Sequence, residues 1–265
     1  MKIFQLEDFK SSFFMFFRMH FNFIYDIINW QDLIIKNKKY MESDAMKNNK
    51  KSSKKSTSKK YFYFFIKRCF DILVSIIGCI LLIPITLIIK IAYMLSGDFH
   101  SVIFIQDRIG KDGKHFKFYK FRSMVPDADN ILWEYLKSNS EAAREYKINK
   151  KLKYDPRITR VGRLIRKVSL DEFPQMINVL KGDMSIIGNR PYLPREKVDM
   201  KKYFDKIVVT KPGITGYWQV SGRSDVSFEK RMKLESFYSE NCSLKLDLII
   251  FFKTFKVVLS GIGAK

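Results

Sequence analysis

Residues 67–89 read KRCFDILVSIIGCILLIPITLII, and the 18 positions from Ile72 to Ile89 carry no charge. An uncharged run of this length is long enough to enter a bilayer, and it is a poor match for a core helix of a soluble protein. Lysine-rich sequence precedes the run, and Lys90 and a basic region follow it. Because basic flanks tend to stay in the cytoplasm, we expect both ends of the run on the same side of a membrane.

The proline inside this run suggests how both ends could reach one side. Proline removes one helix hydrogen bond and favours a kink. A straight helix cannot return to its starting face, whereas a helix interrupted near Pro84 can. We therefore expect a re-entrant helix–break–helix within residues 61–96, with Pro84 as the membrane break. A full span is the main alternative, and a buried core helix is the third.

Residues 1–60 form an N-terminal segment with 13 basic and 6 acidic side chains. Residues 13–35 are aromatic but contain charges such as Arg18 and Asp26. This pattern indicates an amphipathic helix, either at the membrane interface or packed on the protein. Residues 36–60 are polar and lysine-rich, which is typical of a flexible linker that is attracted to anionic membrane lipid.

Residues 97–265 predict a small mixed α/β domain. Two β-branched and aromatic runs flank Asp112-Gly113, which is a hairpin turn signal. The tail, residues 245–259, is apolar with interspersed lysines, which suits a helix at the membrane surface or one packed on the domain. The fold class is therefore α+β, with a re-entrant membrane segment and interfacial amphipathic helices. Further helices are expected at residues 127–153, 173–180 and 227–241, and short strands within residues 184–188 and 212–225.

The composition restricts the partners of the chain. Its 265 residues have a net charge of +22, which points to nucleic acid, anionic lipid or phosphorylated small molecules. The three cysteines are scattered and have neither disulfide nor zinc-site spacing. A membrane-anchored nucleic-acid-binding protein would fit the charge, but no nucleic-acid-binding motif is recognisable. We therefore expect lipid and phosphorylated substrates as partners, and no nucleic acid.

Asp171 and Glu172 form a carboxylate pair near the predicted start of a helix. With Ser169 the pair matches a capping box, which is a purely structural role. Arg166 precedes the pair and Arg190 follows it. A carboxylate at a helix start among arginines keeps a low pKa, which suits a metal ligand or a nucleophile that attacks phosphorus. Arginine binds phosphate oxygens in a two-point fashion, so phosphate chemistry is expected, with a structural salt-bridge network as the alternative.

Several stretches resemble, in order, the bacterial sugar transferase family, the monotopic polyprenyl-phosphate phosphoglycosyl transferases. The resemblance covers about three-quarters of the chain and is closest to the undecaprenyl-phosphate galactose phosphotransferases that begin O-antigen, capsule or exopolysaccharide synthesis. The matching stretches are KRCFDILVSIIGCILLIPITLII, VIFIQDRIG, FKFYKFRSM, DPRITRVGRLIRKVSLDEFPQMINVLKGDMSIIGNRP and KPGITGYWQVSGRSD.

This resemblance implies a reaction at the cytoplasmic face of the bacterial inner membrane. A UDP-sugar gives its sugar-1-phosphate to undecaprenyl phosphate, and UMP leaves. Asp171 matches the family's nucleophile, which forms a covalent phosphosugar intermediate, and Glu172 matches the second acid. Both match residues that are expected to bind Mg²⁺. Galactose is the expected sugar, followed by glucose and then by N-acetylated or deoxy sugars, and the resemblance is compatible with a homodimer.

The resemblance also implies four phosphate-binding residues. Arg190 matches the arginine of the family's Pro-Arg-Pro motif, and Arg166 matches a further arginine near the phosphates. Lys120 and Arg122 are expected to contact the phosphates as well. Asn189 stands where the family usually has proline, so a slightly looser loop is expected. A scaffold that keeps the fold without the activity is the alternative, but the intact carboxylate pair and Arg190 argue against it.

Overall fold

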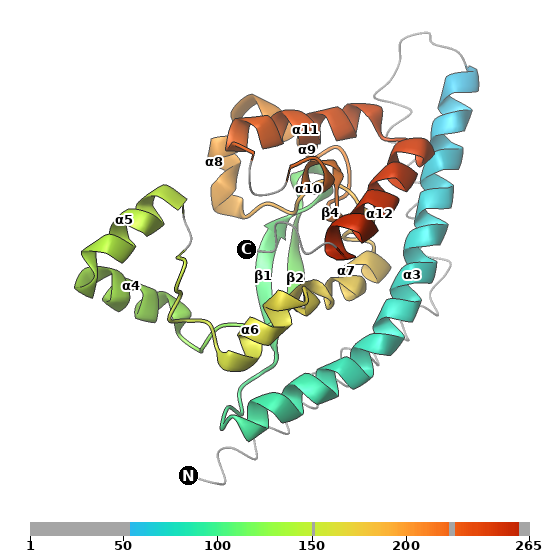
Figure 1. Ribbon diagram of the computed structural model, residues 1–265. Helices are drawn as coiled ribbons and strands as arrows, with labels where there is room; N and C mark the ends of the chain where they lie inside the picture. Colours follow the sequence, from blue (N-terminus) through green and yellow to red (C-terminus); the bar gives the residue numbers. More distant parts are fainter. Residues whose placement is uncertain (1–53, 150–151, 223–225, 260–265) are drawn as a thin grey trace. The chain divides into compact units, whose positions relative to one another are not determined.

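The chain divides into two compact units, Met1–Phe70 and Asp71–Lys265. Of the first unit, only residues 54–70 are described. The predicted amphipathic helix at residues 13–35 and the linker as far as residue 53 lie outside the described residues. The computed structural model, shown in Figure 1, describes residues 54–149, 152–222 and 226–259.

The described residues combine helices with two small sheets, in agreement with the predicted α+β class. The helices are α3 (Lys54–Leu95), α4 (Ala128–Ser138), α5 (Ser140–Asn149), α6 (Arg160–Lys167), α7 (Gln175–Lys181), α8 (Lys197–Met200), α9 (Phe204–Ile207), α10 (Tyr217–Val220), α11 (Phe228–Asn241) and α12 (Leu244–Leu259). The strands are β1 (Ile103–Ile109), β2 (His115–Phe121), β3 (Ser185–Ile187) and β4 (Gly213–Thr215). Short 3₁₀ turns are η1 (Lys111–Gly113), η2 (Leu170–Glu172), η3 (Pro194–Glu196) and η4 (Lys201–Tyr203).

The long helix α3 is continuous across Pro84. The predicted break of the helix near Pro84 is therefore wrong, although the ribbon of α3 is bent (Figure 1). Proline removes a single backbone hydrogen bond, and the bonds of the neighbouring turns keep the helix together. One turn around this point gains a side-chain bond, because the Thr86 hydroxyl donates to the Leu82 carbonyl at 2.7 Å. Entry and exit of α3 by one membrane face stays a prediction.

The first turns of α3 also differ from the prediction. Residues 54–60 were expected in the flexible linker, but they are helical. Lysine is a good helix former, and extending an existing helix needs no new nucleus, so the helix continues into the basic segment. Within the described part of the chain, one helix, Lys60–Leu95, is long and apolar enough to cross a membrane, judged by length and composition.

Within the second unit, α3 has one buried face and one exposed apolar face. Asp71 fastens the buried face to β3, because its Oδ1 accepts hydrogen bonds from the Ser185 hydroxyl at 3.0 Å and the Ile186 N–H at 2.8 Å. Residues 71–95 of α3 are therefore packed against the domain on one face and exposed on the other. Buried side chains recur every three or four residues at Asp71, Ser75, Cys79, Leu82, Thr86, Ile89 and Tyr93. Exposed aliphatic side chains include Leu73, Ile76, Ile77, Ile80, Leu81, Ile83, Leu87, Ile88 and Ile91.

The hairpin of β1 and β2 confirms the predicted strand pair and its turn. The strands are antiparallel, and Arg108 lies opposite Phe116. Asp112 and Gly113 have positive φ angles of 55° and 75°, the left-handed conformation that Asp and Gly tolerate best. The hairpin packs against α7, where the Asn178 side chain accepts from one backbone N–H of β2 and donates to one of its carbonyls.

The second sheet pairs β3 with β4 in parallel, as short strands were expected in these two stretches. α12 packs against both strands and against α10. The Tyr238 hydroxyl of α11 donates to Asp247 of α12 at 2.8 Å, which joins the two C-terminal helices. α12 is thus packed on the domain by one face. Its other face leaves apolar side chains exposed at Leu244, Leu248, Ile249, Phe252 and Phe255.

The predicted helical stretch at residues 127–153 consists of two helices, α4 and α5, which separate at Asn139.

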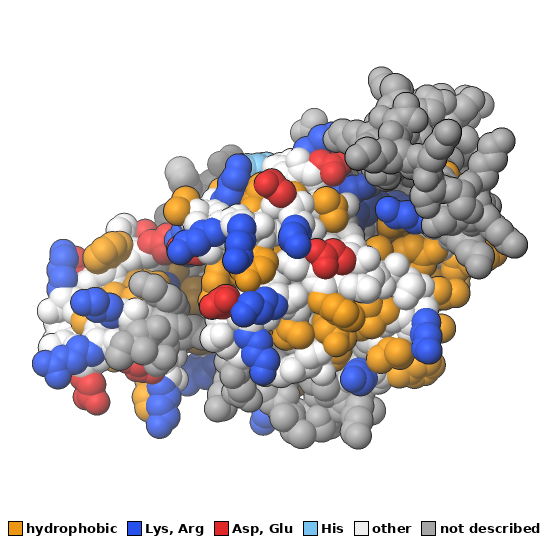
Figure 2. All heavy atoms as spheres, turned by 90° about the horizontal axis from the view of Figure 1, so that it is seen from above, with side chains coloured by type: hydrophobic (Ala, Val, Ile, Leu, Met, Phe, Trp, Pro, Cys, Tyr) orange, Lys and Arg blue, Asp and Glu red, His pale blue; other side chains and the backbone are white. Residues whose placement is uncertain are grey.

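Figure 2 shows one face of the molecule, on which Lys and Arg side chains lie among acidic ones and apolar side chains form patches. The positive charge is therefore spread over this surface as well as placed at the site described next.

Candidate active site

The carboxylate pair, Asp171 and Glu172, lies in the 3₁₀ turn η2 between helices α6 and α7. Ser169 has φ 56° and its side chain makes no capping bond, so the capping box predicted from Ser169 and Glu172 is wrong. The left-handed backbone at Ser169 separates α6 from η2. Pro174 then precedes the first residue of α7, which agrees with the expectation that the helix begins after the pair. Gly182, with φ 87°, ends α7 close to the end of the helix expected at residues 173–180.

Glu172 lines a cavity of about 320 Å³ that is open to solvent. Three cations line it with Glu172: Arg108 from β1, Lys120 from β2 and Arg190 from the loop after β3. We call Arg108, Lys120 and Arg190 the basic cluster. Asp171 is not among the residues that line this cavity, but it directly precedes Glu172 in η2, and its charge acts on both Lys120 and Glu172. The remaining lining residues are Phe118, Gln175, Pro191, Gly213, Ile214 and Gln219.

Burial governs the electrostatics of this cavity. Burial raises the pKa of Glu172, and the attraction of Lys120, Arg190 and Arg108 only partly offsets that effect. The expectation of a low pKa is therefore wrong for Glu172, because removing a carboxylate from water outweighs the nearby cations. Burial also lowers the pKa of Lys120, while Glu172 and Asp171 act in the opposite direction. The cavity thus contains a carboxyl and an amine whose proton affinities are shifted toward each other.

Arg108 is the member of the basic cluster that the sequence analysis missed. Burial lowers the pKa of Arg108 to about 10, so the guanidinium stays protonated at neutral pH. It donates to the Pro191 carbonyl at 3.0 Å and lies 5.2 Å from the centre of the Phe118 ring. The hairpin register places Arg108, Phe118 and Lys120 on one face of the sheet. The two-residue alternation around the Asp112-Gly113 turn was the signal that could have identified it.

Arg122 and Arg166 lie in other surroundings. Arg122 donates to Asp98 at 2.9 Å and to the Ser101 carbonyl at 2.7 Å, and it lies over the Tyr93 ring. Arg166 donates to the Ser123 hydroxyl at 2.9 Å. Neither arginine lines the cavity that contains Glu172 and the basic cluster. The structure therefore brings together Asp171, Glu172, Lys120 and Arg190 of the predicted site residues, but not these two.

Asp171 and Glu172 are candidate ligands for Mg²⁺. Among the described residues, no group of three or more His, Cys, Asp or Glu side chains could hold a metal ion. Mg²⁺ is commonly bound by one or two carboxylates together with substrate phosphates, and it keeps several waters. Asp171 and Glu172, adjacent to cations suited to phosphate, fit that mode of binding. They do not fit a metal site made entirely of protein ligands.

Comparison with known proteins gives a consistent family. The model of the bacterial sugar transferase family matches residues 62–261. The undecaprenyl-phosphate galactose phosphotransferase of Salmonella typhimurium is 47% identical over 202 residues, which are 75% of this chain and 41% of that protein. The exopolysaccharide production protein ExoY of Sinorhizobium fredii is 40% identical over 198 residues, 75% of this chain and 87% of that protein.

A third relative is the galactosyl transferase CpsE of Streptococcus agalactiae, which is 43% identical over 200 residues, 75% of this chain and 43% of that protein. The chain therefore spans about two fifths of the length of several of these curated relatives and most of the length of ExoY. The matched region begins within α3 and includes the hairpin, the carboxylate pair and the Arg190 loop. This chain belongs to the bacterial sugar transferase family.

Proposed function

We propose that this chain transfers a sugar-1-phosphate from a UDP-sugar to undecaprenyl phosphate and releases UMP. The observation that carries the proposal is the convergence of the basic cluster on Glu172 in one open cavity, with Asp171 beside it. Arginine and lysine side chains from three separate segments suit the two phosphates of a sugar nucleotide. The names of the relatives, which include an undecaprenyl-phosphate galactose phosphotransferase and a UDP-galactose-lipid carrier transferase, support the same reaction.

The proposed reaction has two displacements at one phosphorus. A carboxylate oxygen of Asp171 attacks the β-phosphorus of the UDP-sugar, the bond from that phosphorus to the bridging oxygen breaks, and UMP leaves with the bridging oxygen. The enzyme then carries the sugar phosphate as an acyl phosphate on Asp171. A phosphate oxygen of undecaprenyl phosphate attacks the same phosphorus, the bond to Asp171 breaks, and the lipid-linked pyrophosphate sugar is released. Asp171 returns to a free carboxylate.

The other residues of the cavity have separate roles in this proposal. Arg190, Arg108 and Lys120 hold the phosphates and stabilise the charge that develops on their oxygens. Glu172, whose pKa is raised by burial, lies beside the three cations that would bind the phosphates. Asp171 and Glu172 would also hold Mg²⁺ together with the substrate phosphates. When bound, Mg²⁺ would neutralise phosphate charge and orient the pyrophosphate.

Galactose is the sugar that we propose, because several relatives are named for galactose transfer. UDP-glucose is the first alternative. A UDP-N-acetylated sugar is the second, since a relative from Aeromonas hydrophila that is 37% identical over 210 residues is named as an N-acetylgalactosaminephosphotransferase. A panel of UDP-sugars, compared by the rate of UMP release, would rank them. Faster release with UDP-glucose than with UDP-galactose would contradict the galactose assignment.

The exposed apolar faces of α3 and α12 support a place at the bacterial inner membrane, with the domain on the cytoplasmic face. We propose that α3 enters and leaves by that face. Single cysteines introduced at Lys60 and Gly97 would then react with an impermeant maleimide from the same side. Reaction from opposite sides would instead establish a full span.

The activity has a direct test. Purified protein in detergent or nanodiscs is mixed with UDP-galactose, undecaprenyl phosphate and Mg²⁺, and UMP release is followed. We expect Asp171→Asn to abolish release, while Asp199→Asn, an exposed carboxylate on α8, serves as the matched control and keeps it. Full activity in Asp171→Asn would refute the nucleophile assignment. The absence of UMP release by the wild type with every UDP-sugar would refute the proposed reaction.

A further inference from the structure

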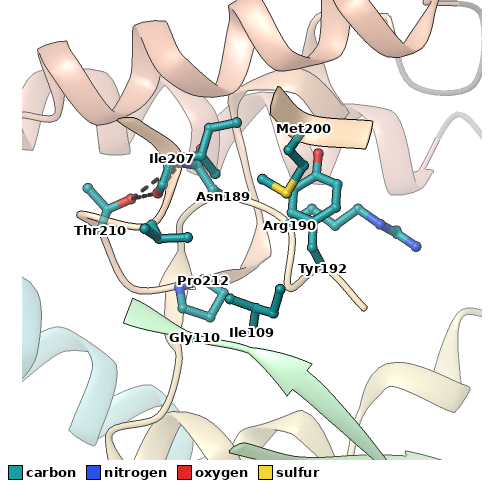
Figure 3. Close-up of a pocket in the computed structure, with 10 residues that line it drawn as sticks. Ile109, Gly110, Asn189, Arg190, Tyr192, Met200, Ile207, Thr210 and Pro212 are labelled. Carbon is teal, nitrogen blue, oxygen red and sulfur yellow. Dashed lines mark hydrogen bonds between the residues drawn. The ribbon is translucent and has the colours of Figure 1, made fainter. Parts of the chain in front are cut away.

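The loop that carries Arg190 is held by hydrogen bonds from both sides. Asn189 is 2% exposed, and its Nδ2 donates to the Ser239 hydroxyl at 2.7 Å, to the Ile207 carbonyl at 3.2 Å and to the Thr210 hydroxyl at 3.3 Å. Figure 3 shows Asn189 directed toward Thr210 and Ile207, and the Arg190 side chain extending away from them. Asn189 therefore anchors the loop inward while its neighbour points outward.

The next two residues are held as well. The Arg190 N–H donates to Oε1 of Glu235 at 3.4 Å, and the Pro191 carbonyl accepts from Arg108 at 3.0 Å. Each of three consecutive residues thus has a partner outside the loop: Ser239 and Glu235 lie on α11, Ile207 on α9 and Arg108 on β1. Loop backbone that is bonded on both sides has few alternative conformations.

One face of α11 carries the partners on its side. Arg231, Glu235 and Ser239 are spaced four residues apart, so they lie on one face of the helix. Glu235 is fully buried, and Arg231 lies 5.0 Å from the centre of the Tyr192 ring, next to the loop. This face of α11 is therefore built against residues 189–192.

We propose that Ser239 and Glu235 are positioning residues for Arg190. Ser239 holds the side chain of Asn189 and Glu235 holds the backbone N–H of Arg190, so that the Arg190 guanidinium points into the cavity that contains Glu172. The looser loop expected from asparagine in place of proline is then offset by the hydrogen bonds of the Asn189 amide. The role of Arg190 as a phosphate ligand rests on the proposed function. The effect of Ser239 and Glu235 on the order of the loop can be tested without substrate.

The first test is hydrogen exchange of the loop amides in the full-length protein without substrate. Ser239→Ala removes the shortest hydrogen bond to Asn189. Glu235→Met removes the acceptor for the Arg190 N–H and keeps a side chain of similar length. We expect both to speed exchange of residues 187–192 about fivefold, the effect of one ordinary hydrogen bond. Ser236→Ala is the matched control, because Ser236 is a buried serine on α11 whose hydroxyl has no hydrogen-bond partner among the described residues. Unchanged exchange in Ser239→Ala would overturn the proposal, even if Glu235→Met fails to fold.

The second test asks whether the effect passes through Arg190. In the UMP-release assay we expect Ser239→Ala to raise KM for UDP-galactose about fivefold with kcat within about twofold of wild type. Glu235→Gln, which keeps an acceptor oxygen, should stay close to wild type. In an Arg190→Ala background, Ser239→Ala should not raise KM further. A further rise in KM of the full size would indicate a merely structural effect and would refute the role of Ser239. The two tests can give different answers. If the variants speed amide exchange but the wild type releases no UMP, the proposed function is contradicted, whereas the role of Ser239 and Glu235 in ordering the loop is still supported.

Discussion

The buried carboxyl of Glu235 predicts a dependence of stability on pH that can be worked out in advance. Burial raises the pKa of Glu235 from 4.5 to about 7, although Arg231, Tyr192 and Arg190 act to lower it. The unfolded chain therefore ionises this group at a lower pH than the folded protein does. Its contribution to stability is fully present below about pH 4.5 and is lost as the pH rises through about 7.

The size of this loss follows from the shift. One pKa unit corresponds to about 1.4 kcal/mol, so the shift of Glu235 amounts to roughly 3 kcal/mol at pH 8. Glu235→Gln keeps the acceptor oxygen for the Arg190 N–H and removes the charge that burial disfavours. We therefore expect the variant to gain roughly 3 kcal/mol relative to wild type between pH 4.5 and pH 8. For a domain of this size that gain is about 6–12 °C in the melting temperature.

The assay is thermal unfolding in detergent at a series of pH values from 4.5 to 8, with wild type and variant in the same buffers. The measured quantity is the difference in melting temperature at each pH, so the pH dependence of other groups cancels. Glu240→Gln, on the same helix, is the matched control: it removes an exposed carboxylate that pairs with Lys206, and it should bring no gain in melting temperature as the pH rises. A difference that is constant with pH, or that favours wild type at pH 8, would refute the reasoning about burial.

Three other predictions follow from packing and charge. Gly162→Ala would place a Cβ in a clash with the Ser123 carbonyl oxygen, so we expect severe destabilisation, seen as a loss of folded protein or a melting temperature lower by more than about 10 °C. Asp71→Ala leaves the buried Ile186 N–H without its acceptor, and should lower stability by about 2–3 kcal/mol in denaturant titrations. Arg108→Lys loses the two-point geometry of the guanidinium, and should raise KM for the sugar nucleotide about tenfold while the protein stays folded.

Each of these variants has an outcome that would contradict its prediction, and Gly162→Ala has a control on the same helix. Lys167→Ala on α6 changes an exposed side chain and should leave the melting temperature unchanged, in contrast to Gly162→Ala. A normal melting temperature in Asp71→Ala would mean that the Asp71 bonds to β3 contribute little. Wild-type KM in Arg108→Lys would mean that Arg108 holds the loop through Pro191 rather than binding phosphate.

Much of the fold was predictable because it depends on local patterns. The alternation on both sides of Asp112-Gly113 predicted the hairpin, and helical spacing predicted α7. The helices expected at residues 227–241 and 245–259 lie close to the observed bounds of α11 and α12. The order of motifs around Asp171-Glu172 predicted the family, which the comparisons confirm. Local chemistry suffices for these features, since turn residues and hydrophobic periodicity act over a few positions.

The membrane segment was predicted correctly in its apolar character and wrongly in its break. Charge-free length is a property of the sequence itself, so the candidate membrane helix was recognisable from residues 72–89. The continuity of α3 across Pro84 depends on the hydrogen bonds of the surrounding turns and on packing, which a single proline does not determine.

The composition of the site was decided by tertiary structure. The sequence by itself proposed Asp171, Glu172, Lys120 and Arg190 as site residues, because they belong to recognisable motifs. It also suggested Arg122 and Arg166, which are bonded elsewhere, and it missed Arg108, which reaches the cavity only because the hairpin lies against the Arg190 loop. The direction of the Glu172 pKa shift likewise depends on how much of the carboxyl is buried, and the support of Arg190 depends on where α11 packs. Residue type and spacing determine which groups are available, whereas burial and long-range contacts determine which of them meet and in what charge state.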